Sequence, residues 1–277
     1  MRKKGSIFLS VLIGAGIAIA LAIAINYQAR LEIKKSYNFR DRCEARLLSR
    51  SVIDALSRNP LSIPPYKLQE GRWISVESVD LERYININSI ILPDGKTVDV
   101  KWRKIFERIF NLNAVSLDLI PRICDFIDGD REPRLGGFEG EGNLNRKLYL
   151  IDELLLMNGM NEKLFKSFFS RYFTAISSRK VNLNTAPKEI LMALSDEIDE
   201  EVADAIIEFR KNHPLRSFSD LKKIPSFPPK IIPDLAQVCC FEGKYFRLRV
   251  KVKVGEVILK TEAVVSDGKI IYEREGW

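Results

Sequence analysis

An uncharged apolar run near the N-terminus is the strongest constraint on how this 277-residue chain can fold. Residues 6–25 contain no charged side chain, and a helix of that length spans about 30 Å, the thickness of a bilayer's hydrocarbon core. The run therefore predicts one transmembrane helix. Arg2, Lys3 and Lys4 precede it, so the positive-inside tendency places the N-terminus in the cytoplasm and the rest of the chain outside it, although the basic residues Arg30, Lys34 and Lys35 weaken the bias.

The rest of the chain has the composition of a folded protein. Hydrophobic residues make up 46% and charged residues 29% of the sequence, which is the range of ordinary globular domains. The net charge of +7 lies largely beside the membrane segment, where it need not imply nucleic acid. The chain contains one histidine, His213, and no CxxC spacing among its four cysteines. Because histidine-based catalysis then has little support, we expect a protein that is not an enzyme.

The periodicity of the soluble part predicts an α+β fold. Residues 26–58 lack proline and continue the helix until Asn59-Pro60 ends it, and Ile63-Pro64-Pro65 is expected to open a loop. Arg72 to Ile91, including Tyr84–Asn88, is predicted to form strands, with a turn at Asp94-Gly95. Residues 244–260 alternate apolar and basic side chains, and Gly255-Glu256 and Asp267-Gly268 are predicted hairpin turns.

These elements predict a specific domain order. A long N-terminal helix (6–58, with 6–25 in the membrane) is followed by an antiparallel sheet that a helical insertion divides. The head of the protein is assigned to residues 59–96 and 238–277, and the inserted helical domain to residues 97–237. The insertion contains a unit like a helix-hairpin-helix at residues 181–225.

The first residues resemble a type IV prepilin signal. The leader, residues 1–5, ends in Gly5, and cleavage after this glycine by prepilin peptidase would make Ser6 the mature N-terminus. Most proteins with this signal carry glutamate at the fifth mature position, whereas this chain has Ser10. Residues 1–30 alone are equally compatible with an ordinary uncleaved signal anchor.

Nearly the whole chain resembles the minor pseudopilin K family of type II secretion systems. The resemblance rests on seven segments in the family's order: the leader, Tyr84–Asn88, Ile123–Asp130, the acidic run to Gly142, Asp152–Leu154 with Asn158-Gly159, Val181–Pro187, and the terminal hairpins. It implies a pilin-like α+β fold whose sheet is interrupted by a large α-helical domain. It also implies a subunit of the bacterial inner membrane with a periplasmic head, which caps or initiates the pseudopilus with I-type and J-type minor pseudopilins and contacts the major pseudopilin.

Residues 125–142 are rich in carboxylates and glycines. Oxygen ligands on a flexible loop suit calcium, but the spacing is not that of an EF-hand, and from the residues alone a solvated acidic loop is the better interpretation. The family resemblance implies a structural calcium site instead. The candidate ligands are Asp125, Asp128, Asp130, Glu139, Glu132, Glu141 and Asn143. A hydrolase with two catalytic carboxylates is an alternative that no other feature supports.

The strongest rival is a membrane-anchored DNA-binding protein of the competence type. Val181–Pro187 and the helices after it resemble helix-hairpin-helix modules, which hold phosphate on backbone N–H groups of a glycine-containing hairpin. Here the connection, residues 195–201, has no glycine and carries five carboxylates, which would repel a phosphodiester. We therefore expect a helical packing unit that binds no nucleic acid.

Overall fold

The computed structural model describes residues 2–276, with side chains from residue 11 onward. The chain divides into two compact units: unit 1 comprises residues 1–78, 248–263 and 268–277, and unit 2 comprises residues 79–247 and 264–267. Met1 lies outside the described residues, and only the backbone is described at the predicted processing residues Gly5 and Ser6.

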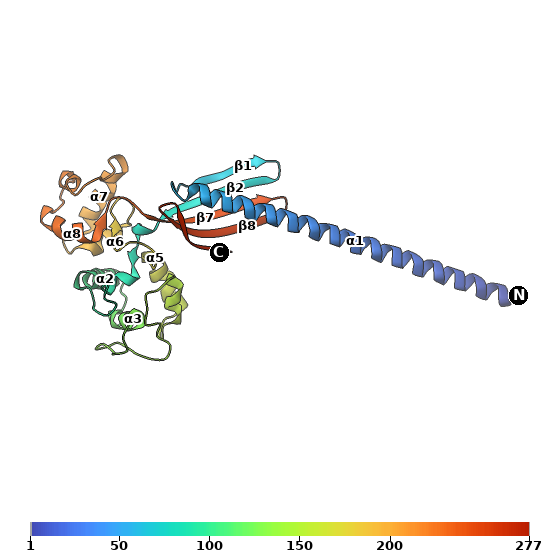
Figure 1. Cartoon of the computed structure of the whole chain (residues 1–277), viewed down its shortest axis with the longest axis horizontal. Coiled ribbons are helices and arrows are strands. Elements are labelled where there is room, and N and C mark those ends of the chain that lie inside the picture. Colours follow the sequence, from blue (N-terminus) through green and yellow to red (C-terminus); the bar gives the residue numbers. More distant parts are fainter. Residues whose placement is uncertain (1, 277) are drawn as a thin grey trace. The chain divides into compact units, whose positions relative to one another are not determined.

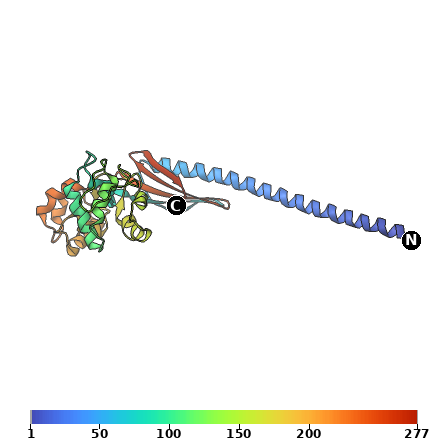
Figure 2. The ribbon, with the colours of Figure 1, turned by 90° about the horizontal axis from the view of Figure 1, so that it is seen from below.

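Unit 1 begins with one continuous helix, α1 (Arg2–Leu56). In the described part of the chain, α1 is the one helix long and apolar enough to cross a membrane, and its side chains from Val11 to Ile25 are exposed. Its C-terminal part lies along the sheet in both views (Figures 1 and 2). There Ser49 Oγ hydrogen-bonds to Thr261 Oγ1 at 2.8 Å, while Arg46 forms an ion pair with Glu275.

The sheet of unit 1 has five strands in the order β1-β2-β7-β8-β9. The strands are β1 (Ile63–Gln69), β2 (Arg72–Asp80), β7 (Tyr245–Val254), β8 (Val257–Ser266) and β9 (Lys269–Glu275). Along β7, Leu248, Val250, Val252 and Val254 are buried, and the basic residues between them are half-buried. This alternation confirms the predicted strand with one buried face. The predicted turns at Gly255 and Gly268 are also present, both with positive φ.

The expected loop at Ile63-Pro64-Pro65 was wrong, because these residues begin strand β1. β1 is an edge strand that pairs only with β2, with Ile63 opposite Val76. Proline cannot donate a backbone hydrogen bond, so it is excluded from central strands but tolerated at an edge. The two prolines are therefore compatible with an edge strand and do not end the sheet.

Unit 2 is mainly helical around one hydrophobic core. Its longest helices, α2 and α7, carry buried apolar side chains at helical spacing, including Trp102, Phe106 and Phe110 on α2. The helices are α2 (Val100–Leu112), α3 (Leu119–Ile127), α4 (Glu162–Leu164), α5 (Ser170–Tyr172), α6 (Lys188–Leu194), α7 (Glu200–Asn212) and α8 (Ile232–Val238). A π-helical turn covers Phe165–Phe169, and 3₁₀ turns cover Leu81–Arg83, Ile87–Ile90, Ile151–Leu156, Asp220–Lys223 and Pro229–Ile231.

Two pairs of short parallel strands complete unit 2. β3 (Ile85–Asn86) pairs with β4 (Phe173–Thr174), and β5 (Val181–Asn182) pairs with β6 (Cys239–Cys240). The cysteines of the chain that the structure describes are all free thiols.

The prediction that Tyr84–Asn88 belongs to the main sheet was wrong. Ile85 and Ile87 are fully buried in the core of unit 2, and the two asparagines between and after them are buried as well. Asn86 donates to the carbonyl of Ser177 at 2.8 Å, and Asn88 donates to that of Leu148 at 3.0 Å. The alternation of apolar and polar residues was real, but the polar side chains bond to buried loop carbonyls instead of facing water. For this reason unit 2 begins at Val79, whereas the insertion was assigned to residues 97–237.

Candidate functional site

The acidic loop starts at the C-terminal end of α3. Asp125 lies in the last turn of this helix and Asp128 caps it, and both side chains are fully buried. The C-terminus of a helix carries partial negative charge and disfavours carboxylates. Burial away from water adds to this cost unless positive charge is supplied. The end of α3 therefore requires a cationic partner.

Arg134 supplies part of that charge. Its Nη1 donates to Asp125 Oδ1 at 2.8 Å and also contacts Asp128 Oδ2, while Nη2 donates to the carbonyl of Lys96 at 2.5 Å. The backbone N–H of Arg134 donates to Asp125 Oδ2 at 3.1 Å. Burial alone would lower the pKa of the guanidinium, but the hydrogen bonds that it donates to Asp125 and Asp128 raise this pKa above its ordinary value. Sequence analysis missed Arg134, whose only signal was a cation in the middle of an acidic run.

A second carboxylate group lies beyond this ion pair. One oxygen each from Asp128, Asp130 and Glu139 lie within 4.8 Å of one another. Two buried oxygens there, Asp128 Oδ1 and Glu139 Oε1, have no hydrogen-bond partner. Burial raises the pKa of both Asp128 and Glu139. Arg134 opposes this rise at Asp128 and Asn143 opposes it at Glu139, while the neighbouring carboxylates add to it. Unpaired buried acceptors that converge in this way fit a hard divalent cation, which prefers oxygen ligands.

The other predicted ligands take different positions. Asp125 is bound by Arg134, and Glu132 and Glu141 are exposed and outside the group of three. Asn143 supports the loop through its amide nitrogen, which donates to Glu139 Oε2 at 3.0 Å and to the carbonyls of Phe138 and Asp125. Gly137 passes so close to Asp125 Oδ2 that a Cβ would collide with it. The structure thus gathers three of the seven candidates and uses two more to hold the loop.

The unit at residues 181–225 is built from α6, α7 and their acidic connection. Asp199 caps α7 by accepting from the N–H of Val202 at 2.9 Å. Asp196 forms a two-point ion pair with Arg108 of α2, at 2.6 and 2.7 Å. Lys188 pairs with Glu200 at 2.6 Å. These exposed carboxylates serve as a helix cap and as partners of basic side chains within unit 2.

The segment before α6 is a hydrogen-bonded anchor for several loops. Asn184 donates to the carbonyls of Leu215 and Phe241, both at 2.8 Å, and accepts from the N–H of Leu215 at 2.9 Å. Arg210 of α7 donates to the carbonyls of Leu183 and Ala186. Asn184, which lies in the segment that resembles helix-hairpin-helix modules, therefore bonds to the backbone of unit 2.

Two buried carboxylates near the start of unit 2 accept hydrogen bonds from segments far away in the sequence. Asp80 accepts from Asn182 Nδ2 at 2.7 Å and Thr185 Oγ1 at 2.6 Å. Glu82 is fully buried and accepts backbone N–H groups of Ser178 and Tyr245 at 3.2 and 3.0 Å. Burial raises the pKa of Glu82, whereas these backbone donors lower it.

Comparison with known proteins finds a family match over the region that begins with this segment. Residues 181–238 match the family model described as type II secretion system protein K, and no curated protein sequence matches the chain. The fold is similar to that of a protein chain in the crystal structure of the GspK-GspI-GspJ complex from the type 2 secretion system of enterotoxigenic Escherichia coli. The TM-score is 0.59 at 15% identity, over 90% of this chain and 99% of that chain. The resemblance to the K family is confirmed.

The K-type fold accounts for the elements that the sequence predicted. A long N-terminal apolar helix, an antiparallel sheet and a set of helices occur in one α+β chain, as expected. β2 and β7 are neighbours in the sheet although the helices of unit 2 separate them in the chain. The apolar part of α1 fits a single-pass membrane anchor.

Proposed function

We propose that this chain is a minor pseudopilin of a type II secretion system, which caps or initiates the pseudopilus together with I-type and J-type minor pseudopilins. The observation that carries the proposal is the sheet divided by a helical unit on a single long helix, combined with the K-family match at residues 181–238. The similar chain comes from a complex of GspK with GspI and GspJ. In this role the protein is an assembly subunit without catalytic activity.

Size and the N-terminal sequence support the proposed tip position. Unit 2 contains residues 79–247, a bulk that is difficult to place between closely packed subunits inside a fibre. Ser10 stands at the position where most such proteins carry glutamate. A subunit with no neighbour above it needs no buried carboxylate there. The apolar helix would keep the protein in the bacterial inner membrane, with the head in the periplasm, until the fibre contacts it through the major pseudopilin.

Processing by prepilin peptidase tests the proposal. Mass spectrometry of the chain from cells that contain this peptidase should show a mature N-terminus at Ser6. Replacement of Gly5, Gly5→Val, should leave the leader attached. The wild-type chain should also co-purify with I-type and J-type pseudopilins. An intact Met1 in wild-type protein, together with no co-purification, would contradict the assignment.

We also propose that the acidic loop holds a structural calcium ion. Asp128, Asp130 and Glu139 would bind it, while Arg134 keeps Asp125 in place. The ion would supply the positive charge that Asp128 Oδ1 and Glu139 Oε1 lack, and so fix the loop against the end of α3.

Calorimetry with and without a chelator tests the calcium proposal. A ligand at a hundred times its Kd stabilises by about 2.7 kcal/mol, so we expect chelation to lower the unfolding temperature by about 5–10 °C. The double variant Asp128→Asn/Glu139→Gln should lose this difference. Glu132→Gln/Glu141→Gln, which changes exposed carboxylates outside the group, should keep it. Identical unfolding temperatures for the wild type in both conditions would refute the calcium site.

A further inference from the structure

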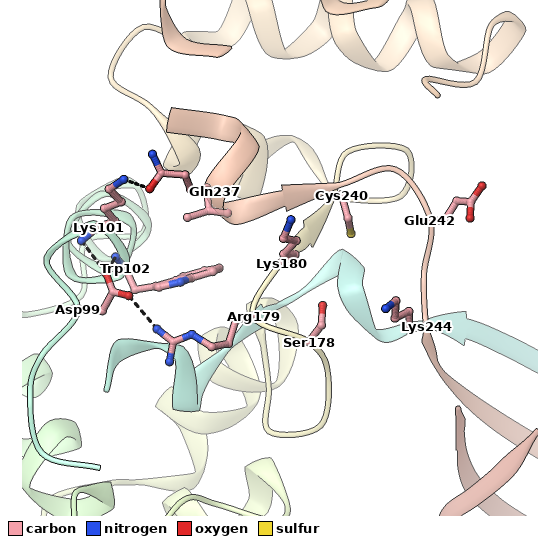
Figure 3. A pocket seen from close by; sticks show the side chains of 11 residues that line it. Asp99, Lys101, Trp102, Ser178, Arg179, Lys180, Gln237, Cys240, Glu242 and Lys244 are labelled. Atoms are coloured by element: carbon pink, nitrogen blue, oxygen red, sulfur yellow. Dashed lines mark hydrogen bonds and ion pairs between the residues drawn. The ribbon is translucent and has the colours of Figure 1, made fainter. Parts of the chain in front are cut away.

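Unit 2 contains a cavity of about 500 Å³ that is separate from the acidic loop. Three segments of the chain line it: the start of α2, residues 178–180, and residues 237–244 (Figure 3). Trp102 is among the lining residues, with 3% of the residue exposed. The volume lies within the range of pockets that bind small ligands or a few side chains.

Two of the four cationic side chains in the cavity already have partners. Arg179 donates to Asp99 Oδ2 at 2.8 Å and to the carbonyl of Ser89 at 2.9 Å. Lys101 is hydrogen-bonded to Gln237, as the dashed line in Figure 3 marks. Asp99 is neutralised by Arg179 and caps α2 through the N–H of Lys101 at 3.0 Å. These side chains line one side of the cavity and are already paired with groups of the protein.

The other two cationic side chains are lysines that remain available to a ligand. Lys180 and Lys244 line the cavity and are exposed, and within residues 11–276 neither ammonium has a hydrogen-bond or ion-pair partner. They come from separate segments, as Figure 3 shows. Glu242 is the one lining carboxylate without such a partner in the same part of the chain. The cavity therefore has an excess of positive charge beside an apolar wall.

We propose that this cavity binds a short acidic segment of a partner protein, whose carboxylates meet Lys180 and Lys244 and whose apolar side chain lies against Trp102. Charge complementarity selects the carboxylates, since each lysine offers three donors and no acceptor. Apolar atoms form part of the cavity lining, which favours a peptide over a simple anion, because burying apolar surface adds to affinity. Glu242 disfavours a continuous run of phosphates, whereas separate carboxylates can be placed away from it. The site does not depend on the pseudopilus role.

Titration calorimetry on the full-length chain in nonionic detergent tests the proposal. The probe is a blocked peptide with two glutamates flanked by leucines, compared with the same peptide carrying glutamines and with inorganic phosphate. We expect the acidic peptide to bind and the glutamine peptide to bind at least about tenfold more weakly. Roughly 0.5 M salt should weaken the acidic peptide, because exposed charges are screened.

Matched variants locate the binding. Lys180→Gln/Lys244→Gln should weaken the acidic peptide about tenfold. Lys147→Gln/Lys163→Gln removes the same charge from two exposed lysines elsewhere in unit 2, and should leave the affinity unchanged. All four residues are exposed, so circular dichroism should show folded variants. The proposal is overturned if the wild type does not bind the acidic peptide, if both variants lose affinity equally, or if phosphate binds as tightly as the peptide.

Discussion

Replacement of Phe110 by alanine is expected to lower the free energy of unfolding of unit 2 by about 3–5 kcal/mol, the usual cost of removing a buried phenylalanine ring. Phe110 is fully buried on α2. Its ring centroid lies 5.0 Å from that of Phe168 and 6.0 Å from that of Phe169, both in edge-to-face geometry. Phe106 and Phe173 complete the cluster. Its removal leaves a cavity lined by rigid rings that cannot close easily.

Denaturant unfolding of the full-length chain, followed by tryptophan fluorescence, measures this loss. Phe138→Ala is the matched control, because Phe138 lies in the acidic loop of the same unit and its side chain is 46% exposed. The control should cost far less than Phe110→Ala. Equal losses for the two variants would show that the aromatic cluster is not the centre of this core.

Replacement of Asp80 by alanine is expected to destabilise unit 2 by a similar amount, about 3–5 kcal/mol, because each buried donor left without an acceptor costs roughly 1–3 kcal/mol. The variant removes the acceptor for Asn182 Nδ2, Thr185 Oγ1 and the N–H of Glu82. Asp80 is 8% exposed, so water cannot fully replace the carboxylate. The loss would reach the segment 181–187, which anchors the loops around α6 and α7.

Hydrogen exchange read by mass spectrometry locates the effect of this variant. Peptides covering residues 181–187 should lose protection, while peptides from the β7–β8 hairpin of unit 1 should keep theirs. Asp234→Ala is the control, because Asp234 is an exposed aspartate of the same unit. Unchanged protection at residues 181–187 in Asp80→Ala would refute the anchoring role of Asp80.

Local patterns predicted the sheet better than they predicted the core of unit 2. Along β7, one side of the strand is buried against apolar residues, so the alternation could be interpreted directly. At Ile85–Asn88 a similar alternation is buried on both sides, because Asn86 and Asn88 bond to carbonyls of residues far away in the sequence. The local sequence pattern cannot predict where those distant carbonyls lie in the folded chain. β1 was missed for a related reason, since prolines exclude a central strand but not an edge strand.

The sequence predicted that carboxylates gather in the acidic loop, but it did not predict how they are arranged in space. The sequence showed carboxylates and glycines, but not that Arg134 would turn back onto Asp125 and leave Asp128, Asp130 and Glu139 together. This arrangement of the carboxylates depends on the position of the end of α3 and on the close approach of the Gly137 backbone to the Asp125 side chain. The cavity at Lys180 and Lys244 was outside sequence reasoning altogether, because its lining comes from three distant segments.

The chain leaves the sheet through β2 and returns to it through the neighbouring strand β7. In terms of strand connectivity, residues 81–244, which make up most of unit 2, are one very long connection between two neighbouring strands. An insertion of this kind can grow, shrink or diverge in surface chemistry without any change in strand order. Evolution could therefore alter the surface of the helical unit while α1 and the sheet stay under their own separate constraints.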